Sequence, residues 1–175
     1  MEIIHDTLHQ VGELGPLLLF TTSCWLLFEK KTMLYYYIIG SIINVILNII
    51  MKITIQQPRP RIDDETFQLM LTHFKQDVFK HGIPDIFGMP SGHAQAVIFS
   101  TVFVYLCIKN KNWLILYSVI SLVTMWQRVI YKHHTVGQII IGAFIGAGFA
   151  VCVFYLGKRK IVGILKQRDD DFAFV

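Results

Sequence analysis

Five stretches of mainly apolar residues dominate the chain, and each approaches the roughly 20 residues that a helix needs to cross a bilayer. They lie at 12–28, 33–51, 90–108, 112–130 and 135–157. The first stretch is the weakest, because Thr21, Thr22 and Ser23 interrupt it. The pattern therefore predicts an all-α fold, a polytopic bundle of about five transmembrane helices.

The connections between these stretches decide which helix ends lie together. The connections between 28 and 33 and between 108 and 112 are very short, so they force antiparallel hairpins. Residues 52–89 form one long loop. Because consecutive spans alternate in direction, this loop, the N-terminus and residues 127–134 lie on one side of the membrane, which we call the site side.

A segment of the long loop has apolar residues at helical spacing, between residues that can cap a helix and residues that can end one. The apolar positions are Phe67, Met70, Leu71, Phe74 and Val78. Asp63 and Asp64 precede them, and Gly82 and Pro84 follow. Such an amphipathic helix can lie in the membrane interface or cap the bundle, and the sequence leaves both readings open.

Composition supports a membrane protein and excludes other classes. Of the 175 residues, 54% are hydrophobic and only 16% are charged, whereas soluble domains carry roughly 25% charged residues. A disordered chain, a coiled coil and a water-soluble globule are therefore excluded, and we expect a single membrane-embedded domain over residues 1–175. Cys24, Cys107 and Cys152 lie in apolar stretches and predict neither a disulfide framework nor a zinc site.

Lysine and arginine residues outside the apolar stretches favour the side opposite the site side. They concentrate in the two hairpins and in the Lys158-Arg159-Lys160 cluster. Since cytoplasmic loops of membrane proteins are enriched in Lys and Arg, this distribution predicts a cytoplasmic C-terminus and a site side that faces the lumen or exterior.

Four polar fragments lie at the ends of apolar stretches, and all four fall on the site side. The second stretch leads into Lys52 and Arg59-Pro60, the third begins with Pro90-Ser91-Gly92-His93, the fourth ends near Arg128, and the fifth begins near His134 and Gln138. The alternation of spans alone brings these fragments to one face of the membrane.

Three of these residues are cations suited to a phosphate group. Lys52, Arg59 and Arg128 supply positive charge, and the donor fork of arginine matches phosphate oxygens. None of the fragments resembles a metal cluster. Because the cations can stabilise the charge that a metal would otherwise stabilise, we expect neither a metal nor another cofactor.

The remaining residues predict an anion site beside a pair of proton-transfer groups. Pro90 suits the first turn of a helix, where Ser91 and Gly92 would leave backbone N–H groups open to an anion. Of His93 and His134, one can attack phosphorus while the other protonates the leaving oxygen.

Together these residues resemble the three motifs of the type 2 phosphatidic acid phosphatase superfamily of membrane lipid phosphatases. Its first motif, Lys-x6-Arg-Pro, is similar to the run from Lys52 to Pro60, and its second, Pro-Ser-Gly-His, is similar to residues 90–93. Its third, Ser-Arg-x5-His-x3-Asp, is similar to residues 127–138, where Gln127 replaces the Ser and Gln138 replaces the Asp. The resemblance spans about 52–150.

Further residues look like the dolichyl diphosphatase branch of this superfamily. They are Gln-Pro-Arg-Pro at 57–60, Phe87-Gly-Met-Pro-Ser, His93-Ala-Gln95 and Tyr131-x-x-His134-Thr-x-x-Gln138. That branch also tends to have Gln where most of the superfamily has Asp. It hydrolyses dolichyl diphosphate to dolichyl phosphate and inorganic phosphate on the lumenal face of the endoplasmic reticulum, a location that agrees with the charge distribution. Residues 61–86 are not covered by the resemblance.

The resemblance implies a role for each site residue. His134 would be the nucleophile and form a phosphohistidine, and His93 would protonate the leaving group. Gln138, one helical turn after His134, could fix the imidazole tautomer through its amide oxygen. His133 is the rival nucleophile, although it lies one residue too close to Arg128. The phosphate would be held by Lys52, Arg59, Ser91, Gly92 and Arg128.

Alternatives to a polyisoprenoid diphosphate phosphatase stay open. A phosphatase of the same fold could act on phosphatidate, a sphingoid phosphate or undecaprenyl diphosphate, and a catalytically inactive relative could bind a phospholipid or a partner. The change from Asp to Gln supports the inactive reading, whereas the presence of both His93 and His134 argues against it. The expected partners are the membrane and a lipid phosphate or diphosphate, with no nucleic acid. The sequence does not fix an oligomeric state.

Two further patterns predict helix packing. Gly142 and Gly146 give a small-residue spacing that permits close contact between helices. Ser41, Asn44 and Asn48 fall on one stripe of the second stretch, and we expect them to hydrogen-bond between helices and not to contact substrate.

Overall fold

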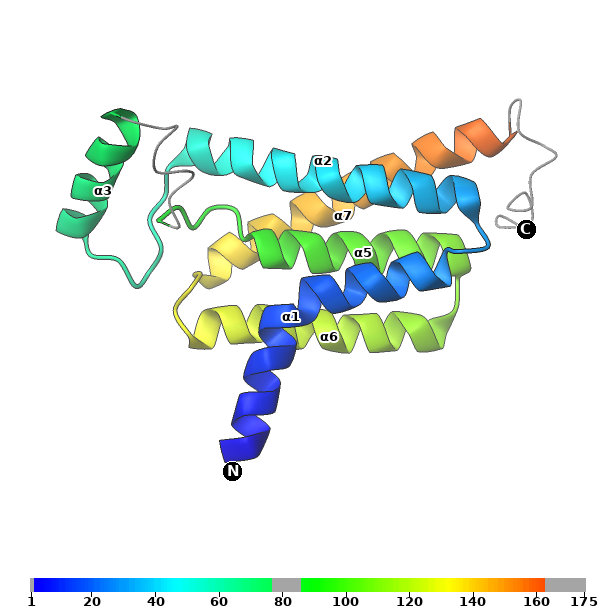
Figure 1. Cartoon of the computed structure of the whole chain (residues 1–175), viewed down its shortest axis with the longest axis horizontal. Helices are drawn as coiled ribbons and strands as arrows, with labels where there is room; N and C mark the ends of the chain where they lie inside the picture. Colours follow the sequence, from blue (N-terminus) through cyan, green and yellow to red (C-terminus); the bar gives the residue numbers. More distant parts are fainter. Residues whose placement is uncertain (1, 77–85, 163–175) are drawn as a thin grey trace.

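A computed structural model describes residues 2–76 and 86–162 of the chain. Every regular element in these residues is a helix (Figure 1). The helices are α1 (Glu2–Leu26), α2 (Lys31–Ile55), α3 (Asp64–Gln76), α5 (Gly92–Ile108), α6 (Lys111–Ile130) and α7 (Val136–Val162). The predicted all-α fold is therefore confirmed.

Each of the five predicted apolar stretches forms a helix of the bundle, and these helices are α1, α2, α5, α6 and α7. Among the described helices, α2, α6 and α7 are long and apolar enough to cross a membrane. α5 is also apolar but has only 17 residues. α1 starts at Glu2, well before the predicted stretch 12–28, because its helix continues through a more polar N-terminal half.

α5 is the central helix and packs against α1, α2, α6 and α7. Phe99 and Phe103 of α5 lie against Tyr37 of α2, with ring centroids 5.8 and 5.5 Å from the Tyr37 ring. Large apolar side chains such as Leu122 and Phe144 are instead exposed on the outside of the bundle, as the lipid phase allows. The core therefore lies around α5.

Two glycines let α7 approach the backbone of α5. A Cβ atom at Gly142 would lie 2.5 Å from the carbonyl oxygen of Ser91, and one at Gly146 would overlap the carbonyl oxygen of Gln95. The packing role predicted for these small residues is confirmed. The close contact places the first turn of α7 beside the start of α5, where the amide of Ser91 donates to the carbonyl oxygen of Gln138 at 3.0 Å.

α1 packs on α6 and diverges from α2. Gly12 packs on the side chain of Gln127, where an added Cβ would lie 2.5 Å from the Cβ of Gln127, and Gly15 packs on Thr124. Pro16 follows within the same helix. Figure 1 shows α1 and α2 joined by a short turn at one end and separating toward the other, where the first half of α1 turns away from the bundle axis.

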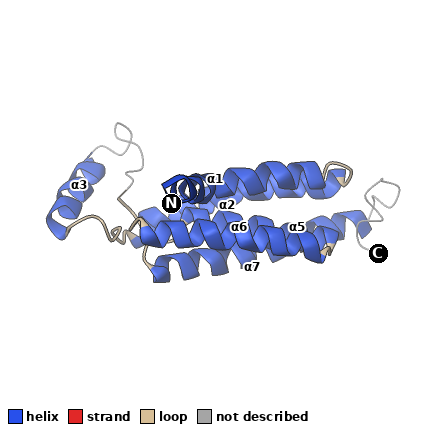
Figure 2. Cartoon of the chain, turned by 90° about the horizontal axis from the view of Figure 1, so that it is seen from below, coloured by secondary structure: helices blue, strands red, loops and turns tan. Residues whose placement is uncertain are grey.

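α3 lies beyond the end of the bundle, across the direction of α2 (Figures 1 and 2). Asp63 caps it by accepting hydrogen bonds from the amide and the hydroxyl of Thr66, both at 2.8 Å. Its apolar face, formed by Phe67, Leu71 and Phe74, packs on Ile86 and Phe87. Met70 was expected on this face but is 39% exposed. Val78, Gly82 and Pro84 lie outside the described residues.

Candidate active site

The four polar fragments meet at one end of the bundle, as the alternation of spans predicts. The last turn of α2, the start of α5, the last turn of α6 and the start of α7 all lie at the end from which α3 extends (Figure 1). Two short segments between the helices complete the site. They are residues 57–59, which follow α2, and residues 86–90, which we call the strap because they lead into α5.

The strap is held against the segment after α2 by backbone pairing. Pro58 and Phe87 form an isolated antiparallel bridge. The amide of Arg59 donates to the carbonyl oxygen of Ile86 at 3.1 Å, and the amide of Gly88 donates to that of Gln57 at 2.8 Å. The pairing uses the carbonyl of Ile86, whereas those of Phe87 and Gly88 contact side chains of the site.

The strap carbonyls accept hydrogen bonds from two of the predicted site residues. The ammonium group of Lys52 donates to the carbonyl oxygen of Phe87 at 3.0 Å. The Nδ1 atom of His134 lies 2.9 Å from the carbonyl oxygen of Gly88 and 3.2 Å from Oε1 of Gln138. Since the carbonyl of Gly88 can only accept, Nδ1 of His134 carries the proton. In the neutral imidazole, Nε2 then keeps its lone pair.

The amide group of Gln138 is oriented by partners on both of its atoms. Its Oε1 accepts from the amide of Thr135 at 3.2 Å as well as from His134. Its Nε2 donates to the carbonyl oxygen of Pro58 at 3.0 Å and to Oε1 of Gln57 at 3.2 Å. Gln138 therefore ties the nucleophile candidate to the segment after α2, and each atom of its amide has a partner of the required type.

The surroundings of His134 favour the neutral ring. Burial lowers the pKa of His134 to about 3, and the positive charges of Arg59 and Lys52 act in the same direction. The hydrogen bonds to Gln138 and Gly88 oppose this shift only in part. At neutral pH the imidazole is therefore uncharged, which is the form that can act as a nucleophile.

His93 lies at the start of α5 and contacts a cation. Its Nε2 atom lies 2.7 Å from a terminal nitrogen of Arg128. Because a guanidinium group only donates, Nε2 of His93 accepts in this arrangement and its proton is on Nδ1. The backbone of Glu13 in α1 also hydrogen-bonds His93. Nε2 of His93 is therefore occupied by Arg128 in this structure.

The start of α5 differs in two details from the sequence prediction. Pro90 lies before the helix and not in its first turn, because Ser91 is the N-cap, with its hydroxyl oxygen 3.5 Å from the amide of Ala94. The amide of Ser91 was expected to be open to an anion, but it donates to the carbonyl of Gln138, because α7 packs directly on α5. The first helical amides, those of Gly92 and His93, have no acceptor within the helix.

The cationic side chains of the site are largely buried. Arg59 is 8% and Arg128 is 7% exposed, and Lys52 is half-buried. Arg59 and Lys52 interact electrostatically with the ring of His134. Arg128 and Arg59 interact in the same way with the ring of His93. Arg59 is thus close enough to influence both rings.

Among residues 2–76 and 86–162, no group of three or more His, Cys, Asp or Glu side chains could hold a metal ion. The polar chemistry that the described residues bring together is therefore that of two imidazoles, three cations and the N-terminus of α5.

Comparison with known proteins identifies the family of the chain. Residues 31–161 match the PAP2 superfamily. The chain belongs to the PAP2 superfamily. It is also 28% identical, over 153 residues, to a protein of Saccharomyces cerevisiae named dolichyldiphosphatase. That match covers 82% of this chain but only 57% of the yeast protein. No solved structure matches the chain.

Membership of the PAP2 superfamily confirms the resemblance carried by the three motifs. The structure brings all eight predicted site residues to one end of the bundle, and their catalytic and phosphate-binding roles stay predictions. Gln127, which replaces the Ser of the third motif, is 1% exposed and packs on Gly12 of α1.

His133 has a different environment from His134. Its Nδ1 lies 3.2 Å from a terminal nitrogen of Arg61, in an exposed contact. Because Arg61 donates, Nδ1 of His133 accepts and the proton of the neutral ring is on Nε2. The tautomers of the two rings are therefore opposite, and the buried one with a free Nε2 lone pair is His134.

Three contributors to the site were not predicted. The carbonyl of Gly88 accepts from His134, the side chain of Gln57 accepts from Gln138, and the backbone of Glu13 contacts His93. Gly88 and Gln57 lie within the sequences that resemble the dolichyl diphosphatase branch, which is the signal that could have found them. Nothing in the sequence marks α1 as part of the site.

Proposed function

We propose that this chain is a membrane lipid phosphatase that hydrolyses a polyisoprenoid diphosphate of the dolichyl type to the monophosphate and inorganic phosphate through a phosphohistidine. Membership of the PAP2 superfamily and the similarity to a dolichyldiphosphatase support the proposal. The observation that carries it is the hydrogen bond from Nδ1 of His134 to Gly88, which leaves the Nε2 lone pair of a buried, neutral imidazole for phosphorus.

In the first step, Nε2 of His134 forms a bond to the terminal phosphorus of the diphosphate. The bond from that phosphorus to the bridging oxygen breaks, and His93 gives a proton to the departing oxygen. The phosphorylated ring becomes positively charged. The carbonyl oxygen of Gly88 and the side-chain oxygen Oε1 of Gln138 stabilise this charge by accepting from Nδ1–H.

The phosphate is held by Lys52, Arg59, Arg128 and the first amides of α5. Ser91 serves as the N-cap that presents the amides of Gly92 and His93. Arg128 donates to Nε2 of His93 in the phosphate-free structure. When substrate binds, Arg128 therefore turns from His93 to the phosphate oxygens. Nε2 of His93, which carries no proton in the phosphate-free structure, then takes up a proton from solvent, and this is the proton that it transfers to the departing oxygen.

In the second step, water attacks the phosphorus of the phosphohistidine. His93, which lost its proton in the first step, now takes a proton from this water, and the bond between phosphorus and Nε2 of His134 breaks. The products are inorganic phosphate and the regenerated enzyme. Both steps use the same cations to stabilise the transferred group.

The proposed location follows from the same comparison. The site side faces the lumen of the endoplasmic reticulum and the C-terminus faces the cytoplasm. The Lys and Arg residues of the hairpins and the name of the yeast relative support this location.

The test measures phosphate release from a panel of dolichyl-type diphosphate, undecaprenyl diphosphate, phosphatidate and a sphingoid phosphate. We expect the purified native protein to prefer the dolichyl-type diphosphate. With a labelled diphosphate, acid-labile phosphate should form on the native protein and on His133→Ala but not on His134→Ala. His93→Ala should accumulate the label, because hydrolysis of the phosphohistidine lacks its base.

Each other result contradicts a named part of the proposal. A preference for phosphatidate or the sphingoid phosphate would show that the tail is not a polyisoprenoid. Label on His134→Ala and none on His133→Ala would make His133 the nucleophile. No hydrolysis of any lipid by well-folded protein would identify an inactive relative.

A further inference from the structure

His93 has a partner on each of its two ring nitrogens. Nε2 accepts from a terminal nitrogen of Arg128 at 2.7 Å, so the proton of the neutral ring is on Nδ1. The hydrogen bond with the backbone of Glu13 is therefore made by Nδ1, and because Nδ1–H donates, the acceptor is the carbonyl oxygen of Glu13. Glu13 and His93 also line one cavity, of about 300 Å³. The ring is thus held between α6 and α1.

The backbone around His93 is held separately, by α2. The amide nitrogen of Asn48 donates to the carbonyl oxygen of Pro90 at 3.2 Å and to Oε1 of Gln95 at 2.8 Å. The amide nitrogen of Gln95 donates in turn to Oδ1 of Asn44 at 2.8 Å. These contacts confirm the predicted hydrogen bonding between helices by Asn44 and Asn48. Because they hold the start of α5, the contacts with α1 and α6 have only the orientation of the imidazole left to decide.

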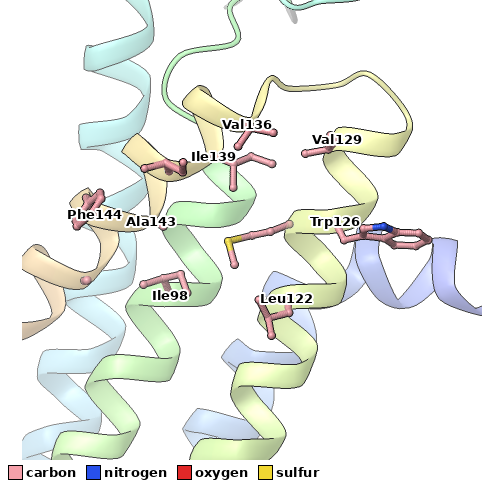
Figure 3. Close-up of a pocket in the computed structure, with 11 residues that line it drawn as sticks. Ile98, Leu122, Trp126, Val129, Val136, Ile139, Ala143 and Phe144 are labelled. Atoms are coloured by element: carbon pink, nitrogen blue, oxygen red, sulfur yellow. The ribbon is translucent and has the colours of Figure 1, made fainter.

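Pro16 explains why a carbonyl within a helix is open to a side chain. A proline has no N–H to donate to the carbonyl four residues before it, here that of Gly12, and its ring forces the helix to bend there. Figure 3, which draws the apolar pocket between α6 and α7, shows α1 as the faint blue ribbon behind Trp126, and its two halves run in different directions. Glu13 lies in the turn that the bend opens. Its carbonyl oxygen has two lone pairs and can therefore accept from His93.

Contacts with α6 hold α1 on both sides of Pro16. Before the bend, the ring of His9 lies edge-on to that of Tyr131, with ring centroids 4.6 Å apart. After the bend, the hydroxyl groups of Ser23 and Tyr117 lie 3.1 Å apart. Each half of α1 is therefore fixed on α6, and the carbonyl groups of the bend have a defined position beside the start of α5.

A carbonyl acceptor at Nδ1 has two consequences for the proposed reaction. It keeps Nε2 of His93 directed at the phosphate, because the ring cannot rotate without losing this hydrogen bond. It also stabilises the charged ring that His93 passes through before it protonates the departing oxygen, since a charged donor makes the stronger hydrogen bond. His134 has the same arrangement, with its Nδ1 on the carbonyl oxygen of Gly88. Backbone carbonyls thus orient both imidazoles.

We propose that Pro16 and the backbone carbonyl of Glu13 position His93 for proton transfer. Both are positioning residues, since neither contacts phosphate in the proposed mechanism. This inference rests on the proposed function, because it takes from that proposal the role of His93 as acid and base. It gives α1 a part in the reaction besides its part in the packing of the bundle.

The second step of the reaction should depend on this positioning more than the first. In the first step the departing lipid phosphate is a weak base, since the second pKa of a phosphate monoester is about 6. In the second step His93 takes a proton from water, whose pKa is about 15.7. A misplaced imidazole should therefore slow hydrolysis of the phosphohistidine more than its formation.

The first test replaces Pro16 by alanine, which restores the missing N–H and lets α1 straighten. With labelled lipid diphosphate, we expect Pro16→Ala to lower turnover by about tenfold, a part of the roughly 10²–10⁴ that general acid–base groups contribute. The steady-state fraction of phosphorylated enzyme should rise. The control is Leu18→Ala in the same helix, where the side chain is 40% exposed, and both quantities should stay within about twofold of native. Native turnover in Pro16→Ala, or a fall in phosphorylated enzyme, would contradict the proposal.

A second variant moves α1 without changing the proline. A Cβ atom at Gly15 would overlap the hydroxyl oxygen of Thr124, so Gly15→Ala should push α1 off α6 and carry Glu13 away from His93. We expect the same accumulation of phosphorylated enzyme. Thr124→Ala removes the hydroxyl, so the double variant should regain most of the native turnover. A lower level of phosphorylated enzyme in Gly15→Ala, or no recovery in the double variant, would count against the proposal.

A spectroscopic measurement without substrate separates this inference from the proposed function. In protein with nitrogen-labelled histidine, the Nδ1–H of His93 should exchange slowly with water because it is hydrogen-bonded to α1, and His93→Ala assigns its signal. Pro16→Ala should speed this exchange by about tenfold, whereas Leu18→Ala should not. Equal exchange in the native protein and in Pro16→Ala would overturn the inference. If the exchange differs as expected but the native protein forms no phosphohistidine, the contact with α1 stands and the proposed function fails.

Discussion

The amide nitrogen of Gln138 donates to the carbonyl oxygen of Pro58 at 3.0 Å, while the amide oxygen of the same side chain accepts from His134. A carboxylate could make only the second of these contacts, because it has no proton to donate. The relationship gives a physical reason for Gln at a position where the third motif of the superfamily has Asp. In this chain the residue connects the nucleophile candidate to the segment after α2.

Gln138→Glu should therefore lower kcat although it keeps an oxygen beside His134. The carboxylate would face the carbonyl of Pro58 and leave that acceptor without its donor. The loss of a buried hydrogen bond costs about 1–3 kcal/mol, which corresponds to roughly a 5- to 150-fold fall in rate. Steady-state kinetics on native, Gln138→Glu and Gln138→Ala proteins check this. A variant with Glu that equals the native rate would show that the contact with Pro58 has no role in turnover.

Gly88→Ala should strongly reduce turnover. A Cβ atom at Gly88 would lie 2.5 Å from Oε1 of Gln138, which is too close for any real contact. The amide of Gln138 would move, and His134 would lose its orientation. The matched control is Gly148→Ala, because a Cβ at Gly148 meets nothing within 4 Å. If both variants retain native kcat, the position of Gln138 does not limit the reaction.

The imidazole of His134 should stay neutral in mildly acidic solution. Burial lowers the pKa of His134 to about 3. When the pH falls through about 6.5, the ordinary histidine value, the ring should therefore stay uncharged, with a proton on only one nitrogen. Nitrogen NMR of histidine-labelled protein without substrate can follow the ring, with His134→Ala used to assign its signals. We expect one protonated and one unprotonated nitrogen at pH 5. A titration of this ring near pH 6.5 would contradict the prediction.

Catalysis should need no divalent metal. In the proposed mechanism, Lys52, Arg59 and Arg128 supply the positive charge that stabilises the transferred phosphoryl group. Phosphate release should therefore be unchanged by EDTA and by later addition of magnesium or zinc. A reproducible loss with EDTA that is restored by one of these metals would show that the cations are insufficient.

The site side should be accessible only from the lumen or exterior. Asp64 and Lys111 are both exposed, and they lie at opposite ends of the bundle. In a variant with its native cysteines replaced, Asp64→Cys should react with a membrane-impermeant thiol reagent from the lumenal or outer side, and Lys111→Cys only from the cytoplasm. The reverse pattern of labelling would invert the proposed orientation.

The sequence was sufficient to predict the helices of the bundle and the meeting of the polar fragments. Both follow from local properties, since a run of apolar residues forms a helix in lipid and short hairpins force neighbouring spans to alternate. The contact between Gln138 and His134 was predictable for the same reason, because residues four apart share a helix face.

Contacts between segments that lie far apart in the sequence could not be predicted from it. The amide of Ser91 was expected to face an anion, but the close approach at Gly142 gives it the carbonyl of Gln138. The small-residue spacing predicted a close approach, but it did not show which helix α7 would contact. The entry of α1 into the site depends likewise on its bend and on the packing of Gly12, which no periodicity reveals.

The packing of α3 on the strap connects a segment that carries none of the predicted site residues to the candidate site. Phe67 and Phe74 pack edge-on against Phe87, with ring centroids 6.2 and 5.5 Å away. The next residue, Gly88, accepts from His134. A substitution that changes the shape of the apolar face of α3 should therefore shift Phe87 and, through Gly88, the orientation of the His134 imidazole. If His134 acts as proposed, substitutions in the long loop can therefore change the rate of the reaction while all the residues proposed to bind phosphate stay the same.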